Sequence, residues 1–241
     1  MFTCSITHAG MGLLSVSFTF MPTSHFISTL ELRGRRKRFA QFVNLALKVT
    51  VRHRPTRILD VGGTWAYWSQ FDWSRLGRVE VVLLNVFPQE PVPPPFTVVV
   101  GDGRDLSRFQ DGEFDIVYSN SVLSLVGALP DQERMAREVR RVGKSYFVQT
   151  PNRRFIIDWR TLVPFFHLLP PALQAWCFQR FRVGTYPRFK NGAEALHQAS
   201  RIRDLTAGEL RALFPDATIT RERVLGLTKS FSLHSGFTQS H

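Results

Sequence analysis

The segment Asp60-Val-Gly-Gly-Thr64 has the residue types and spacing of a turn that brings the backbone close to a ligand. It follows the apolar run Arg57–Val61, which predicts a short buried strand, and leads into Trp65–Phe71, which we expect to be helical. Glycines at a strand-to-helix turn remove side-chain bulk, and the start of the helix offers free N–H donors. Such turns also occur without a ligand, so the segment alone leaves a plain tight turn as an equal alternative.

Polar residues follow the next two predicted strands as well. Asn85 lies near the end of Val79–Val86, where a doubly wound sheet usually has an acid that binds ribose hydroxyls. An asparagine amide can make one or two of those hydrogen bonds without the charge. After the strand Phe96–Val100, Asp102 could accept a hydrogen bond from an adenine amine, and Gly103 keeps the backbone close.

A further predicted strand, Phe114–Ser119, ends in small polar residues. Ser119 and Asn120 come at its carboxyl end. Open α/β sheets bind their ligands along the carboxyl edge of the strands. The sequence therefore predicts that these polar residues gather at one edge of a sheet.

The elements that position these residues alternate between strands and helices. A fifth strand is predicted at Ser145–Gln149, and the preceding segment Asp131–Val142 has the apolar spacing of an amphipathic helix. Unbroken Val/Ile/Leu strands separated by helices indicate a parallel sheet covered on both faces, which is a doubly wound α/β fold. The basic segment Arg35–Val51 predicts another helix, with one apolar face.

The region Pro151–Arg201 interrupts this alternation. It is rich in aromatic residues and contains a Pro-Pro pair, so we expect an inserted helical cap over about 151–201. Its aromatic side chains either form the core of the cap or close over an apolar acceptor. After it, a capping-box pattern at Thr206–Glu209 opens a short helix, and Ala217–Arg221 and Gly226–His234 predict a terminal antiparallel strand pair.

Composition sets the limits on partners and compartment. The chain has 241 residues, a net charge of +12 and two cysteines, Cys4 and Cys177, so neither a disulfide scaffold nor a cysteine-based metal site is expected. We expect a cytoplasmic protein without a transmembrane segment, with residues 1–30 as a poorly ordered tail before the domain 31–241. The charge leaves open a contact with nucleic acid or with an anionic membrane surface, although no RNA-binding signature supports the first.

Several segments, taken in order, resemble class I S-adenosylmethionine-dependent methyltransferases, and in particular a bacterial and archaeal subgroup. They are ILDVGGT, VVVGDGRDL, FDIVYSNSVLSLVG, REVRRVGKSYFVQTPNR and LGLTKSF, which extend from about Arg57 to Leu233. The resemblance implies a seven-stranded, mostly parallel Rossmann-like sheet whose last strand is antiparallel, with S-adenosylmethionine bound along its carboxyl edge. The donor-binding positions that we expect are Asp60, Gly62, Gly63, Asn85, Asp102, Gly103, Ser119 and Asn120.

The chain departs from that subgroup at positions that could perform acid–base chemistry. Ser124-Leu125 stands where a Glu-His pair is common, and Ile156–Arg160 replaces a Pro-x-Glu-Pro-His stretch. The remaining candidates for a general base are Asp158 and His167, and no histidine spacing indicates a metal site.

The sequence therefore predicts methyl transfer from S-adenosylmethionine to a small, partly apolar acceptor. Two alternatives stay open at this point. One is a binding module that keeps the fold without turnover, which the altered Ser124-Leu125 and Asn85 positions favour. The other is a methyltransferase that acts on RNA or protein, which only the positive charge supports.

Overall fold

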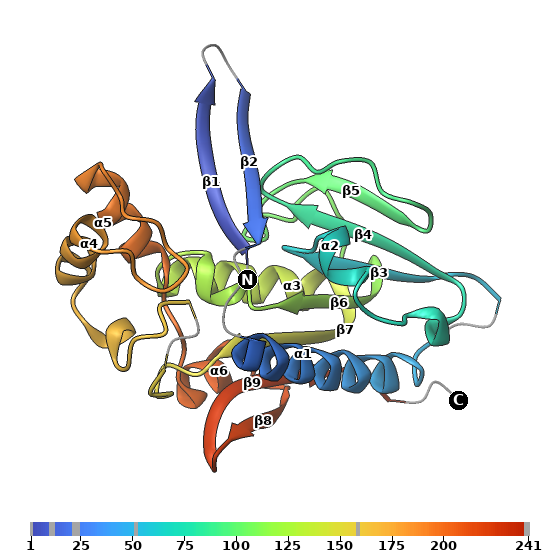
Figure 1. Cartoon of the computed structure of the whole chain (residues 1–241). Helices are drawn as coiled ribbons and strands as arrows, with labels where there is room; N and C mark the ends of the chain where they lie inside the picture. Colours follow the sequence, from blue (N-terminus) through green and yellow to red (C-terminus); the bar gives the residue numbers. More distant parts are fainter. Residues whose placement is uncertain (1, 10–12, 21–24, 51–52, 158–159, 239–241) are drawn as a thin grey trace. The chain divides into compact units, whose positions relative to one another are not determined.

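The computed structural model describes residues 2–9, 13–20, 25–50, 53–157 and 160–238 (Figure 1). The chain divides into two units, one made of residues 1–35 and 156–200 and the other of residues 36–155 and 201–241. The second unit contains the main sheet and every predicted donor-binding residue.

Seven strands form that sheet in the order β5-β4-β3-β6-β7-β9-β8. Their bounds are β3 Thr56–Val61, β4 Val79–Asn85, β5 Phe96–Val100, β6 Phe114–Asn120, β7 Gly143–Pro151, β8 Thr218–Val224 and β9 Leu227–Ser235. Strands β3 to β7 pair in parallel, whereas β9 is antiparallel to both β7 and β8. The predicted doubly wound, mostly parallel sheet is confirmed. The strand order reverses between β3 and β6, which is the switch point where such sheets bind ligands.

Helices cover both faces of the sheet, with α1 on one side and α3 on the other (Figure 1). The helices of this unit are α1 His25–Ala46, of which residues 36–46 belong here, α2 Trp65–Trp68, α3 Leu129–Val142 and α6 Ala207–Leu213, with 3-10 turns at η1 Ser74–Leu76 and η2 Leu123–Leu125. The sequence placed the first helix at 35–51, but it begins and ends earlier. It buries Phe39, Phe42, Val43 and Ala46 in one core.

The second core lies on the α3 face. Met135, Ala136, Val139 and Val142 are fully buried there against β6, β7 and α6, at the spacing of one helical face. Each large aliphatic side chain removed from water in this way contributes about 1.5–3 kcal/mol to folding. These two cores hold the sheet rigidly, so the ends of its strands have fixed positions.

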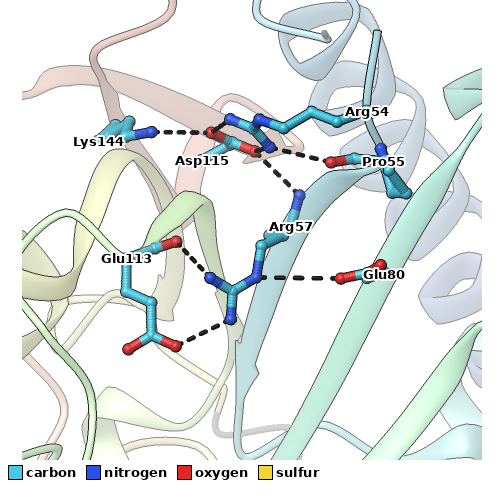
Figure 2. Close-up of polar contacts among 7 residues, drawn as sticks. All are labelled: Arg54, Pro55, Arg57, Glu80, Glu113, Asp115 and Lys144. Atoms are coloured by element: carbon cyan, nitrogen blue, oxygen red, sulfur yellow. Dashed lines mark hydrogen bonds and ion pairs between the residues drawn. The ribbon is translucent and has the colours of Figure 1, made fainter.

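An ion cluster holds the strands together at the amino edge, opposite the expected ligand edge (Figure 2). The Arg54 guanidinium donates to both oxygens of the buried Asp115 carboxylate, at 2.5 and 2.6 Å. Lys144 Nζ and the main-chain N–H of Arg57 donate to the same carboxylate at 3.2 and 3.0 Å. Burial alone would raise the pKa of Asp115, but these hydrogen bonds lower it to about 2. The cluster thus joins β3, β6 and β7 where they begin.

The first unit contains the strands β1 Phe2–Ala9 and β2 Leu13–Phe20, which pair antiparallel, and the helices α4 Pro171–Arg180 and α5 Gly192–Arg201. A 3-10 turn, η3, covers Phe166–Leu168. Phe166 and Phe178 pack with three alanines and Val183 into a small core, so part of the aromatic content serves the packing of this unit. Trp176 and Phe181 remain about half exposed. None of the helices in the described ranges has the length and apolar character needed to cross a bilayer.

Candidate donor site at the carboxyl edge of the sheet

The glycine turn after β3 lies directly against the loop that follows β6. Gly62 has a φ of +79°, and its N–H donates to the carbonyl of Leu84 at 2.7 Å. A Cβ on Gly62 would lie 2.3 Å from Cγ2 of Val122. Because both the backbone conformation and the space exclude a side chain, only glycine fits here. The turn is therefore packed closely against the loop after β6 at the switch point.

The helix expected after this turn is much shorter than predicted. Only Trp65–Trp68 is helical, with the Thr64 hydroxyl accepting the N–H of Tyr67 at 3.3 Å. Trp68 is fully buried in the α1-side core, where its ring contacts Phe39, Phe42 and Phe96. One turn of helix is too short for an N-terminal anion site, so the glycines carry the ligand hypothesis at this place.

The Asp60 side chain packs against the glycine turn. Its carboxyl is buried, and Oδ2 accepts a 2.7 Å hydrogen bond from the Trp68 indole. Burial raises the pKa of Asp60 to about 7, which the hydrogen bond from Trp68 only partly offsets. A Cβ on Gly63 would lie 2.3 Å from the same carboxylate oxygen. The Asp60 side chain thus occupies the space directly beneath Gly63.

Asn85 is placed beside the turn, but its amide is already in use. Its Nδ2 donates to the carbonyl of Gly63 at 3.2 Å, and its Oδ1 accepts from the N–H of Val86 at 2.9 Å. Gln89 Nε2 donates to the same Gly63 carbonyl at 3.1 Å. Sequence reasoning missed Gln89 and also Val86, whose side chain is 62% exposed although it is aliphatic and follows a buried strand. That exposure is the signal of an apolar surface at the edge.

The loop after β5 brings a carboxylate to the same edge. Asp102 is about one-third exposed, and both of its oxygens contact the Arg104 guanidinium. Hydrogen bonding to Arg104 lowers the pKa of Asp102, so it is ionised at neutral pH. Gly103 passes so close to β3 that a Cβ would lie 2.6 Å from Val61 Cγ1. The sequence singled out Asp102 and Gly103 but not Arg104.

The end of β6 supplies one buried acceptor without a partner. Ser119 Oγ donates to the Val61 carbonyl at 3.1 Å and so ties β6 to β3. Asn120 Oδ1 is buried and has no hydrogen-bond partner among the described residues. The next residue, Ser121, has a φ of +62° and donates to Gln149 Oε1 at 2.6 Å. Since buried polar atoms are rarely left unpaired, Asn120 Oδ1 points to a ligand group.

Comparisons with known proteins agree with this geometry. Residues 79–146, from β4 into β7, match the family model described as a methyltransferase domain. A candidate sarcosine dimethylglycine methyltransferase from Galdieria sulphuraria has the same fold, with a TM-score of 0.50 and 14% identity over 83% of this chain and 69% of that one. The family model thus matches strands β4, β5 and β6 of the sheet, and the solved structure shares the fold.

Two further solved structures are similar to this chain. A chain of the complex between the activator Trm112 and a candidate methyltransferase from Haloferax volcanii has a TM-score of 0.49 and 12% identity, covering 90% of this chain and 96% of that one. A SAM-dependent methyltransferase from Aquifex aeolicus has a TM-score of 0.45 and 11% identity, covering 89% and 98%. No curated protein sequence matches the chain.

The eight predicted donor-site residues all belong to the unit that contains the main sheet. The eight lie at the carboxyl ends of β3, β4, β5 and β6, within one unit. His167 lies in η3 of the other unit, whose placement relative to the sheet is not determined. Asp158 lies outside the described residues. At the position of the missing Glu-His pair, Ser124 is fully buried and Leu125 is partly exposed.

Proposed function

We propose that the chain transfers a methyl group from S-adenosylmethionine, bound along the carboxyl edge of β3, β4, β5 and β6, to a small and partly apolar acceptor. One observation carries the proposal: a glycine turn, an ionised carboxylate and an unpaired buried amide oxygen lie at the carboxyl ends of strands β3, β5 and β6 of one sheet. The donor-site residues in this account are Asp60, Gly62, Gly63, Asn85, Asp102, Gly103, Ser119 and Asn120.

The proposed roles follow from the contacts of each side chain. Asp102 accepts the exocyclic amine of adenine, and the exposed Val86 provides an apolar surface for the ring. Asn85 holds the carbonyl of Gly63 and reaches the ribose through the amide positions that its internal bonds leave. Asn120 Oδ1 accepts a hydrogen bond from an ammonium or hydroxyl of the donor. Asp60 and Ser119 keep the turn and β6 in place.

S-adenosylmethionine supplies an electrophilic methyl group on a sulfonium, so the protein needs mainly to align the acceptor with it. A general base is required only when the acceptor is protonated, and Asp158 and His167 are the residues proposed for that role. The aromatic-rich composition of residues 151–201 supports an apolar acceptor. The Asp-Val-Gly-Gly-Thr turn and the Gln-Thr-Pro-Asn-Arg segment support the bacterial and archaeal subgroup, and the two cysteines suit a cytoplasmic setting.

The second candidate function is a binding module without turnover. The buried Ser124 favours it, because a buried serine at the position of the Glu-His pair offers no charged group to an acceptor. A methyltransferase acting on RNA or protein is supported only by the net charge of +12.

The formation of S-adenosylhomocysteine from S-adenosylmethionine separates these functions. We expect turnover with phenolic or other apolar small molecules and none with bulk RNA at low salt. Donor binding without turnover on any acceptor would favour the binding module. Turnover that requires RNA and declines steeply with salt would favour the nucleic-acid enzyme.

A further inference from the structure

The Asp102 carboxylate, which the proposed function assigns to adenine, already accepts hydrogen bonds from three N–H groups of Arg104. A carboxylate offers about four lone-pair positions, two on each oxygen. Oδ1 accepts from the Arg104 main-chain N–H at 2.9 Å and from Nε at 3.0 Å. Oδ2 accepts from Nε at 2.9 Å and from Nη2 at 2.5 Å. The single Nε proton is shared between the two oxygens, so an adenine amine that binds Asp102 competes with the Arg104 guanidinium for these acceptor positions.

Arg104 has a second carboxylate within reach of the same guanidinium. Its Nη1 donates to Asp131 Oδ1 at 3.2 Å and to the carbonyl of Val126 at 3.4 Å. Asp131 lies in the first turn of α3, where its Oδ2 accepts the N–H of Ala128 at 3.3 Å. The guanidinium thus bridges the loop after β5 and the start of α3, and it keeps an anionic partner when it leaves Asp102.

The exchange costs little because the pair is partly exposed. The side chains of Arg104 and Asp102 are 39% and 36% exposed, so water and salt weaken their attraction. Ion pairs in such positions contribute about 0–1 kcal/mol, which a ligand hydrogen bond can offset. If this ion pair were fully buried, breaking it would cost much more, and adenine could not displace Arg104.

We propose that Arg104 is a gate on the adenine subsite: it occupies Asp102 when no donor is bound and shifts toward Asp131 when adenine takes its place. This inference rests on the proposed function, because it concerns the carboxylate assigned to the donor. Arg104 acts through Asp102 and is therefore a positioning residue.

Titration of the full chain with S-adenosylhomocysteine and with adenosine tests the gate. We expect Arg104→Gln to bind both ligands about two- to fivefold more tightly than the wild type, since it removes the competing cation. Asp131→Asn keeps an acceptor for the helix cap but weakens the second anchor of Arg104, so it should bind both ligands more weakly. Arg140→Gln is the matched control, because Arg140 belongs to a similarly exposed ion pair, with Asp216 at 3.7 Å, and has no contact with Asp102 or Asp131 among those the structure describes; it should leave affinity unchanged.

The salt dependence has a sign that a merely structural role for Arg104 would not produce. Raising the salt concentration screens the Arg104–Asp102 pair, so the wild type should bind adenosine more tightly as salt increases. Arg104→Gln should show no such increase. Binding that weakens in Arg104→Gln, or that is unchanged at all salt concentrations, overturns the gate.

Failure of the gate and failure of the proposed function give different results. If the wild type binds and Asp102→Ala weakens binding, but Arg104→Gln does not strengthen it, only the gate is wrong. Binding by Arg104→Gln alone supports a gate that is closed in the wild type. Binding by neither protein contradicts both proposals.

Discussion

The indole Nε1 of Trp68 donates a 2.7 Å hydrogen bond to Oδ2 of Asp60, and both side chains are buried beneath the glycine turn. The carboxyl at the end of β3 is thereby fixed by the helix that follows the turn, eight residues later in the chain. The turn between them is held at both ends. This bond, rather than the length of the helix, sets the position of Gly62 and Gly63.

The buried Asp60 makes stability depend on pH in an unusual direction. Its folded-state pKa is about 7, above the ordinary value of 3.8, so the folded state binds the proton more tightly than the unfolded state. The contribution of Asp60 to stability is fully present below about pH 4 and is lost as the pH rises through 7. Asp60→Asn keeps an acceptor for Trp68 and removes the titration. We expect its free energy of unfolding to match or slightly trail that of the wild type at pH 3 and to exceed it at pH 8 by up to about 4 kcal/mol.

Denaturant unfolding of both proteins across this pH range measures the difference. Parallel stability profiles for the wild type and Asp60→Asn would show that the carboxyl does not titrate there.

Gly62 and Gly77 form a natural pair for testing the turn. Both have positive φ, +79° and +68°, but a Cβ on Gly77 meets nothing within 4 Å. Gly77→Ala should cost about 1–2 kcal/mol for the backbone conformation alone. Gly62→Ala should cost about 1–3 kcal/mol more, because it must also displace Val122. Adding Val122→Ala should recover part of that excess, as measured by urea unfolding. Equal losses for the two glycine variants would contradict the close approach.

The ion cluster at the amino edge predicts that the protein loses stability when the charge of Asp115 is removed. Asp115→Asn leaves Arg54 and Lys144 without their anion and should cost about 1–3 kcal/mol at pH 7. The folded-state pKa of Asp115 is about 2, below the ordinary 3.8, so its contribution is present above about pH 4 and is lost as pH falls through 2. The difference in unfolding free energy between the wild type and the variant should therefore be smaller at pH 3 than at pH 7. Asp111→Asn is the control, since Asp111 pairs with Arg141 but is 81% exposed. An equally large loss of stability in Asp111→Asn would show that the burial of Asp115 does not cause its effect.

The fold was largely readable from the sequence because its signals are local. Short valine-rich and leucine-rich runs such as the one within Val79–Asn85 favour buried strands, and the capping box at Thr206 and Glu209 is present as predicted. The start of α1 at His25 was missed, because the basic run Arg33–Arg38 in the middle of the helix interrupts the apolar stripe that identifies a helix. The helix after the glycine turn was overestimated because Trp68 is held by Asp60, a contact that no local pattern reveals.

The site was readable in part for the same reason. The positions of Asp102 and Asn120 follow from the ends of their strands, which register at one edge of the sheet. Their partners do not follow, because Arg104 bridges to Asp131, which is 27 residues further along the chain. Charge alone did not separate Arg104 from the other arginines and lysines of this basic chain.

Calorimetric titration of the full chain with S-adenosylhomocysteine tests the central claim most directly, with Asp102→Ala and the control Asp111→Ala measured beside the wild type. The account predicts micromolar binding to the wild type and to Asp111→Ala. It predicts binding about tenfold weaker to Asp102→Ala, the factor expected for a lost hydrogen bond to a charged group. Equal binding by all three proteins would place the donor elsewhere, and no binding by the wild type or by Arg104→Gln would contradict a donor site at this edge.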